Sequence, residues 1–222
     1  MRKYCLVLSF LTSFFFLADL RAKSITIMGI GDSITEGGSK FYSYLGPLSD
    51  LLHLAGLDFE LIGEKQVCIG HYKYRHSGYS GKTAEFIDEH VSEIYRNNKA
   101  DIVLIHSGHN YFSEKHPVKT IVAANKSIIM KISKINPKVQ IFVAGVINSG
   151  KLPKYSYIDD LNKEIKSMID DLGYENVAFV DLSDGFDWHI HTVSDKVHPN
   201  LLGAHVMACN WFKAITPYFY KK

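Results

Sequence analysis

Short apolar runs alternate along the chain with longer stretches in which apolar residues recur every three or four positions. The runs are typical of buried strands and cover residues 24–30, 59–63, 101–106, 139–147 and 177–182. The stretches with helical period lie between them, most clearly at 84–94, 118–135 and 158–172. Strands that are apolar on both faces and alternate with amphipathic helices indicate a parallel sheet covered on each side. The pattern therefore predicts an α/β fold, a three-layer α/β/α sandwich with a mainly parallel five-stranded sheet.

Composition agrees with a folded domain. The 222 residues are 46% hydrophobic and 22% charged, which excludes disorder and low-complexity arrays. No linker-like segment divides the chain, so we expect a single domain over 23–222. The formal charge of +2 comes entirely from the basic excess within residues 1–22. Because the remainder is neutral and has no basic stripe, nucleic acid is not an expected partner.

The amino terminus has the layout of a secretory signal peptide. Arg2 and Lys3 precede an apolar run over 4–18 that is too short to span a bilayer comfortably. We expect residues 1–22 to be removed near Ala22, leaving a secreted or periplasmic protein without stable membrane insertion. A retained membrane anchor is the alternative. Cys68 and Cys209 then remain, either as buried thiols or as a disulfide that export would permit.

Binding sites in parallel sheets form beyond the carboxyl ends of the strands, so polar residues directly after the apolar runs are the ones to inspect. Gly31-Asp32-Ser33 follows the first run, and Asp195 stands three residues before His198 near the other end of the chain. A serine needs a base to take its proton, and that base needs an acceptor to orient it. Ser33, His198 and Asp195 supply these three roles. The alternative is that Asp32 and Ser33 only cap a helix.

Two further motifs are Gly78 to Thr83 and Ser107-Gly108-His109-Asn110, the second of which follows the third strand. Together with the first and last motifs they resemble the four blocks of the SGNH or GDSL hydrolases, serine esterases on a flavodoxin-like sheet. The resemblance implies that Ser33, His198 and Asp195 are catalytic. It also implies an oxyanion hole made by the Ser33 and Gly81 N–H groups and the Asn110 amide. Fixed donors of this kind stabilise the negative oxygen of the transition state.

One position departs from the family pattern. The third block usually reads Gly-x-Asn-Asp, but Tyr111 stands here in place of the aspartate. The missing carboxylate usually supports the site, so its loss bears on local geometry and rate more than on the class of reaction. An inactive, glycan-binding relative is an alternative that this departure motivates.

Within the family, the chain is most similar to carbohydrate esterase family three, the acetyl xylan esterase group. The similarity extends over residues 27–37, 45–48, 78–83, 101–106 and 197–200. It implies removal of acetyl groups from a polysaccharide through an acyl-enzyme, and export agrees with such a substrate. A lipase, lysophospholipase or thioesterase on the same scaffold is the other enzymatic alternative.

Several residues are candidates for substrate contact. The segment 71–76 interleaves aromatic and cationic residues, whose rings could stack on sugars, although a solvated loop is the simpler interpretation. Trp188 could line the same cleft or pack beneath a loop. The candidates are Asp32, Tyr74, Arg75, Tyr79 and Trp188.

Histidine-rich sequence near the last block also raises the question of a metal. Asp187, His189, His191 and His198 offer ligand types within twelve residues, and a bound zinc could activate water. We favour the serine mechanism because His198 already has a role in it. No metal or organic cofactor is expected.

Overall fold

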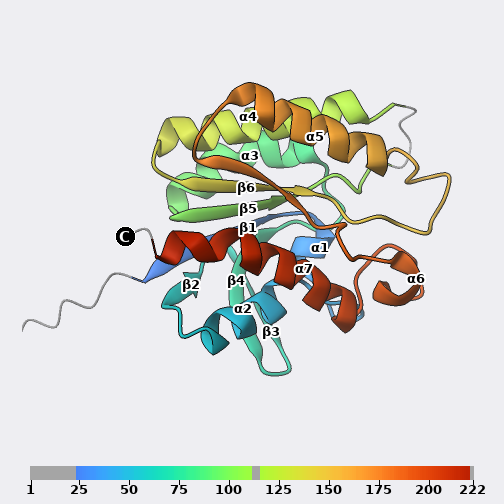
Figure 1. Ribbon diagram of the computed structural model, residues 1–222, viewed down its shortest axis with the longest axis horizontal. Coiled ribbons are helices and arrows are strands. Elements are labelled where there is room, and N and C mark those ends of the chain that lie inside the picture. The colour runs from blue at the N-terminus through green and yellow to red at the C-terminus, as the bar shows by residue number, and fades with distance from the viewer. Residues whose placement is uncertain (1–23, 112–115, 221–222) are drawn as a thin grey trace, which may run out of the picture.

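The computed structural model describes residues 24–111 and 116–220. The predicted signal peptide over 1–22 lies outside the described residues. The fold is the predicted three-layer α/β/α sandwich, with a central, mainly parallel sheet between two layers of helices (Figure 1).

The sheet has seven strands among the described residues, two more than predicted. The five predicted strands are present, and a hairpin between residues 65 and 78 adds the other two. The strands are β1 (Ile25–Gly31), β2 (Phe59–Leu61), β3 (Lys65–Ile69), β4 (Tyr72–Gly78), β5 (Ile102–His106), β6 (Gln140–Gly145) and β7 (Val177–Asp181). The segment 71–76, expected to be a loop, therefore belongs largely to a strand.

The strand order is β3-β4-β1-β5-β6-β7, and β2 pairs with the first half of β1. All pairings are parallel except the hairpin between β3 and β4. The strands that follow β1 in sequence, β2 to β4, lie on one side of β1. The later strands, β5 to β7, lie on its other side. Clefts in such sheets form where the order reverses, which here is the carboxyl end of β1.

Helices cover both faces of the sheet. The helices are α1 (Ser33–Glu36), α2 (Leu45–Leu54), α3 (Ala84–Asn97), α4 (Val118–Ile135), α5 (Ile158–Leu172), α6 (Trp188–His191), α7 (Leu201–Ile215) and the 3₁₀ turn η1 (Thr216–Phe219). One apolar core lies between the sheet and α3, α4 and α5, and a second lies between the sheet and α2 and α7. Figure 1 shows these two layers above and below the strands. The apolar stripes of α3, α4 and α5 are the ones that the helical period predicted.

The carboxyl ends of β1 and β5 approach each other very closely at Gly31. A Cβ atom at this position would lie 2.1 Å from the carbonyl oxygen of His106 and 2.4 Å from the Thr35 hydroxyl. Only glycine fits there, because any side chain would overlap backbone that cannot move aside. The glycine therefore lets the residues after β1 and β5 gather in one small volume.

Cys68 and Cys209 are both free and exposed, which corrects the expectation of buried thiols or a disulfide. In the described part of the chain, no helix combines the length and the apolar character that crossing a membrane requires.

Candidate active site

Three side chains from opposite ends of the chain form a continuous hydrogen-bonded chain at the carboxyl edge of the sheet. The Ser33 hydroxyl oxygen lies 2.8 Å from His198 Nε2, and His198 Nδ1 lies 2.6 Å from Asp195 Oδ2. With the Nδ1 proton on the carboxylate side, Nε2 presents its lone pair to the serine hydroxyl. The hydroxyl can then pass its proton to the ring, which is the arrangement that activates a serine.

A short turn holds Asp195 against His198. Asp195 Oδ1 accepts the backbone N–H groups of Val197 at 2.8 Å and His198 at 2.9 Å, while Oδ2 takes the ring. Burial by itself raises the pKa of Asp195, but the hydrogen bonds from the His198 ring and from these backbone groups outweigh it and lower the pKa. The carboxylate is therefore ionised at neutral pH, ready to balance a positive imidazole.

The turn itself is anchored to the loop that follows β6. Lys196 adopts a left-handed conformation with φ of 62°, and its carbonyl oxygen accepts from Gly150 N–H at 3.0 Å and from the Ser149 hydroxyl at 2.8 Å. A left-handed residue other than glycine costs conformational free energy, so these bonds are needed to fix it. The result is a rigid support for the base.

Ser33 begins α1 directly after β1, and Asp32 caps that helix by accepting Ile34 N–H at 3.0 Å. Both interpretations of the first motif therefore hold, since Asp32 is a helix cap and Ser33 carries the hydroxyl that His198 meets. Ser33 is only 6% exposed. Its own N–H and its hydroxyl share a tight turn at the rim of the sheet.

The second motif lies next to Ser33 because β4 runs beside β1. Gly78 pairs with Gly31 in the parallel register, and Tyr79 N–H donates to the Gly31 carbonyl oxygen at 2.8 Å. Gly81 follows in the exposed loop with φ of 75°, a conformation that glycine adopts without strain. The loop thus presents backbone N–H groups beside the end of β1.

The third motif is tied to the second by the side chain of Asn110. Its amide nitrogen donates one hydrogen to the Lys82 carbonyl oxygen at 2.9 Å, which leaves the other amide hydrogen for a ligand. Asn110 stands after β5 and Lys82 stands after β4. The bond therefore couples two candidate oxyanion donors, the Asn110 amide and the Gly81 N–H, across the end of β1.

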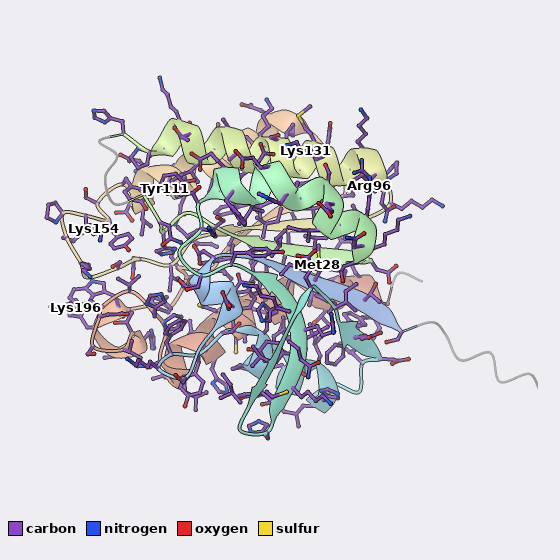
Figure 2. The ribbon with its side chains drawn as sticks, turned by 180° about the vertical axis from the view of Figure 1, so that it is seen from behind. Met28, Arg96, Tyr111, Lys131, Lys154 and Lys196 are labelled. Atoms are coloured by element: carbon purple, nitrogen blue, oxygen red, sulfur yellow. The ribbon has the colours of Figure 1, made fainter. Side chains whose placement is uncertain are left out.

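Tyr111, which replaces the usual aspartate, provides a second tie. Its buried hydroxyl accepts Ala84 N–H at 2.8 Å and donates to the Glu85 carboxylate. Figure 2 shows Tyr111 at the amino end of α3, with Arg96 near the other end. Burial and the bond to Glu85 raise the pKa of Tyr111, so the hydroxyl is neutral and free to donate. The phenol thus connects the third motif to the helix that follows the second.

Phe41 contributes a contact that the sequence analysis did not identify. Its ring stacks on the His198 imidazole, with centroids 4.1 Å apart and an interplanar angle of 24°. The neighbouring Tyr42 N–H donates to the Pro199 carbonyl oxygen at 3.0 Å. The loop between α1 and α2 therefore packs against the catalytic turn and restricts rotation of the imidazole. No motif marks Phe41, because only tertiary packing brings the two rings together.

Two of the expected substrate contacts are corrected by burial. Asp32 has no exposed surface, and one of its oxygens is occupied by the α1 cap, so the expectation that it touches substrate is not met. Tyr74 is 8% exposed and belongs to the core beneath the sheet. The alternation of β4 directs this side chain inward, as period two requires.

The other three candidates reach the surface. Arg75 is exposed on β4, but its guanidinium donates to the carbonyl oxygens of Gly63 at 2.8 Å and Glu64 at 3.4 Å. Tyr79 is half-buried and its hydroxyl donates to the Glu64 carboxylate. Trp188 is partly exposed, and the Lys196 ammonium lies 5.6 Å from its ring. Lys196 belongs to the catalytic turn, so this contact places Trp188 beside that turn.

The suggested metal ligands near the last motif have other partners. His189 Nδ1 pairs with Asp187 at 2.7 Å on the surface, and His191 Nδ1 accepts Asp187 N–H at 2.9 Å. His198 belongs to the hydrogen-bonded chain with Ser33. These side chains cap and brace α6, and the structure does not bring them together as a ligand set.

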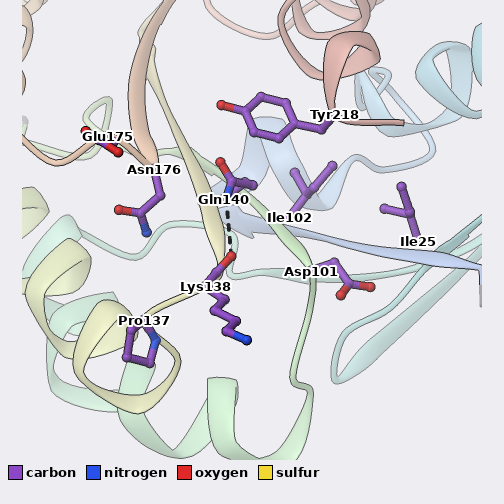
Figure 3. Close-up of a pocket in the computed structure, with 9 residues that line it drawn as sticks. All are labelled: Ile25, Asp101, Ile102, Pro137, Lys138, Gln140, Glu175, Asn176 and Tyr218. Carbon is purple, nitrogen blue, oxygen red and sulfur yellow. Dashed lines mark hydrogen bonds between the residues drawn. The ribbon is translucent and has the colours of Figure 1, made fainter. Parts of the chain in front are cut away.

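A cavity of about 500 Å³ lies at the opposite edge of the sheet. Residues at the amino ends of β1, β5 and β6 line it, together with neighbouring loop residues: Ile25, Asp101, Ile102, Pro137, Lys138, Gln140, Glu175, Asn176 and Tyr218 (Figure 3). Ser33 and His198 stand at the carboxyl edge, so this cavity is not part of the candidate site.

A serine, an imidazole and a carboxylate linked in this order at the rim of an α/β sheet are the site of a serine hydrolase. Comparison with family models gives the family itself. The model of the GDSL-like lipase/acylhydrolase family matches residues 30–206, and the chain belongs to this family.

Solved structures agree with this assignment. A carbohydrate esterase of family 3 from Talaromyces cellulolyticus has a TM-score of 0.79 at 20% identity, covering 89% of this chain and 99% of that one. A family 3 carbohydrate esterase from Clostridium thermocellum has a TM-score of 0.76 at 26% identity, covering 89% and 98%. A catalytic mutant of an acetylxylan esterase from Geobacillus stearothermophilus has a TM-score of 0.64 at 20% identity, covering 86% and 94%. No curated protein matches the chain.

Proposed function

We propose that this protein is an exported serine esterase that removes O-acetyl groups from a carbohydrate through an acyl-enzyme. The observation that carries the proposal is the continuous chain from the Ser33 hydroxyl through the His198 ring to the Asp195 carboxylate, with contacts of 2.8 and 2.6 Å. No other residue is needed to generate the nucleophile.

In the first half-reaction, Ser33 Oγ attacks the acetyl carbonyl carbon while its proton moves to His198 Nε2. Asp195 balances the positive charge that develops on the ring. The carbonyl oxygen becomes an oxyanion and accepts hydrogen bonds from the Ser33 and Gly81 N–H groups and the Asn110 amide. Such fixed donors stabilise the transition state, with about 3 to 4 kcal/mol for one strong donor.

The intermediate collapses when the bond to the sugar oxygen breaks. His198 donates its proton to that oxygen, so the deacetylated sugar leaves as an alcohol and Ser33 remains acetylated. In the second half-reaction a water molecule loses a proton to His198 Nε2 and attacks the acetyl carbon. Ser33 then leaves with the proton from His198, and acetate is released.

The carbohydrate part of the proposal is supported by likeness and by surface chemistry. Two of the similar structures are family 3 carbohydrate esterases, and a third is a catalytic mutant of an acetylxylan esterase. Trp188 places a partly exposed aromatic ring beside Lys196 of the catalytic turn. The His189 ring stacks on Trp188, with centroids 3.5 Å apart, so the remaining exposed part of the ring is what we propose meets a sugar. Export, expected from the signal-like amino terminus, would place the enzyme where polymeric glycans occur.

Two measurements test the proposal. A fluorophosphonate probe should label the wild-type protein and the Ser49→Ala control but not Ser33→Ala, and acetate release from acetylated xylan or another acetylated polysaccharide should depend on the same residue. Faster hydrolysis of octanoyl than of acetyl esters would favour the lipase alternative over ours. A wild-type protein that takes no probe and releases no acetate, yet binds glycans, would replace the enzyme proposal with the binding one.

A further inference from the structure

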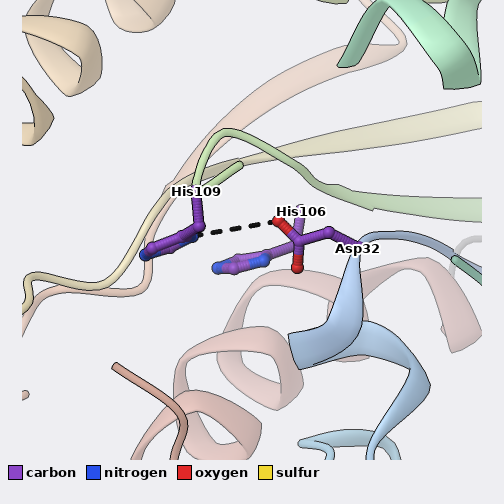
Figure 4. A group of neighbouring side chains, drawn as sticks. All are labelled: Asp32, His106 and His109. Atoms are coloured by element: carbon purple, nitrogen blue, oxygen red, sulfur yellow. Dashed lines mark ion pairs between the residues drawn. The ribbon is translucent and has the colours of Figure 1, made fainter. Parts of the chain in front are cut away.

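Three ionisable side chains are buried together directly behind Ser33. Asp32 follows β1, His106 ends β5, and His109 lies in the loop after it (Figure 4). Asp32 and His106 have no exposed surface and His109 has 2%. One ligand-type atom of each residue lies within 4.8 Å of the others. The close approach at Gly31 is what brings these two strand ends into the same volume.

The contact between His109 and Asp32 joins two atoms that both carry lone pairs. His109 Nε2 lies 2.9 Å from the Ile147 carbonyl oxygen, which can only accept, so Nε2 carries the ring proton. The neutral ring therefore presents a lone pair at Nδ1, which faces Asp32 Oδ2 at 3.9 Å. This separation is too long for a hydrogen bond. Two tetrahedral ligands with bonds of about 2.0 to 2.2 Å lie about 3.3 to 3.6 Å apart, so a small inward movement of the two side chains would let one ion bind both.

His106 adds a third donor. Neither of its ring nitrogens has a hydrogen-bond partner, and the same is true of Asp32 Oδ2 and His109 Nδ1. These four atoms are nearly half of the nine buried side-chain nitrogen and oxygen atoms without a partner in the described part of the chain. Because a buried polar atom without a partner costs free energy, a concentration of them at one point indicates a ligand that binds there.

We propose that Asp32, His106 and His109 bind one divalent transition-metal ion, with zinc as the favoured member of the class. Two imidazoles and one carboxylate suit zinc and its neighbours, whereas magnesium and calcium prefer oxygen ligands throughout. Asp32 keeps one oxygen on the α1 cap and offers the other to the metal. The bond from His109 Nε2 to the Ile147 carbonyl is the outer contact that usually orients a metal-binding histidine.

A proton is the simplest competitor for the same position. A His109 ring protonated at Nδ1 would donate a hydrogen bond to Asp32 Oδ2, but the two atoms lie 3.9 Å apart, which is too far for such a bond. The geometry is therefore that of a lone pair facing the carboxylate, and the neutral ring is the form that binds a metal. A buried water molecule is the other competitor, and the experiment below distinguishes it.

The proposed ion has a structural role. Its ligands have almost no exposed surface, so it does not meet the ester, and the acyl transfer proposed above runs without it. By holding Asp32 against the end of β5, the ion would fix the turn that carries Ser33. The proposal does not rest on the esterase function, because metal content and stability are measured without substrate.

The first test measures metal in the whole protein. After exhaustive dialysis against metal-free buffer, we expect about one zinc per chain in the wild type by mass spectrometry, and less than a tenth of that in His109→Leu. His189→Ala is the matched control because it removes an exposed histidine that pairs with a carboxylate at 2.7 Å. It should keep its zinc. Zinc added to chelator-stripped wild type should raise the Tm by several degrees, and that of His109→Leu should not change.

The second test uses the wild-type protein alone, so it stands even if His109→Leu does not fold. Cobalt(II) added to the stripped protein should give the intense visible bands of a four- or five-coordinate ion, and zinc should abolish them. The proposal is wrong if the wild type holds no zinc and cobalt keeps the weak spectrum of the aqueous ion. A buried water molecule would then be the occupant of the cluster. The proposal is equally wrong if zinc is lost from His189→Ala and retained in His109→Leu.

Discussion

The Tyr111 hydroxyl accepts a hydrogen bond from Ala84 N–H at 2.8 Å, and this joins the loop after β5 to the first turn of α3. One residue earlier, Asn110 bonds to Lys82 of the loop before α3. Two consecutive residues, Asn110 and Tyr111, thus hold the segment that follows Gly81. The spacing between the Gly81 N–H and the Asn110 amide depends on these bonds.

We therefore expect Tyr111→Phe to lower kcat on an acetyl ester about tenfold while KM changes little, because a displaced donor weakens only the transition state. Tyr95→Phe is the matched control. It removes an equally buried hydroxyl whose bond to the Ala100 carbonyl oxygen is also 2.8 Å, but it lies toward the far end of α3. Both variants should lose about 1 kcal/mol or more of unfolding free energy. Equal kcat values for the two variants would show that Tyr111 serves stability alone.

Asp195→Asn should lower kcat by about a thousandfold or more. The new amide would face His198 Nδ1 with a donor, which favours the ring tautomer with its proton on Nε2. That nitrogen could then not accept the Ser33 proton. Asp187→Asn is the control, since Asp187 also pairs with a histidine at 2.7 Å but stands outside the catalytic chain. Steady-state kinetics on an acetyl ester measures both, and a tenfold or smaller loss in Asp195→Asn would contradict the assigned role.

Gly81→Ala separates backbone strain from catalysis. Gly81 and Gly173 have φ angles of 75° and 61°, and a Cβ atom at either would meet nothing within 4 Å. Alanine at each should therefore destabilise the protein by about 1 to 2 kcal/mol through conformation alone. Only Gly81→Ala should also lower kcat, by about tenfold or more, as its peptide turns to relieve the strain. Chemical denaturation and kinetics on both variants check this, and a normal kcat in Gly81→Ala would remove its N–H from the oxyanion hole.

Acid should destabilise the fold through His76. Burial lowers the pKa of this ring from 6.5 to about 4, and its Nδ1 accepts Gly78 N–H at 3.0 Å, a bond that protonation would break. The unfolded chain takes up the proton first, so the contribution of His76 to stability is complete above pH 6.5. It is lost as the pH falls toward 4, by up to about 3 kcal/mol. The loss of unfolding free energy between pH 7 and pH 4.5 should be smaller in His76→Gln than in the wild type. An equal loss in the two proteins would show that other groups cause the acid sensitivity.

The sequence alone determined the layers of the fold and the places of five of its strands along the chain. Apolar runs and helical periods are local properties, and parallel strands with helical connections leave few arrangements. It also determined which residues to examine, because the carboxyl ends of parallel strands meet at one edge. Ser33 and His198, 165 residues apart, were expected to meet there, and their side chains are 2.8 Å apart.

The hairpin of β3 and β4 was missed because one of its strands lies at the edge of the sheet. Residues of β3 alternate between exposed and partly buried positions, and Lys73 and Arg75 divide the apolar residues of β4, so neither strand shows a long apolar run. Tyr74 illustrates the consequence. In a loop it would be free to meet a sugar, whereas the pleat of β4 directs it into the core.

Tertiary structure alone decided the surroundings of the catalytic chain. Phe41 reaches His198 across more than 150 positions of sequence, and the pairing of β1 with β5 buries Asp32 beside His106 and His109. A periodic pattern records which side of its own element a residue occupies. It does not record which residue of another element lies opposite, because that depends on strand register and on close approaches such as the one at Gly31.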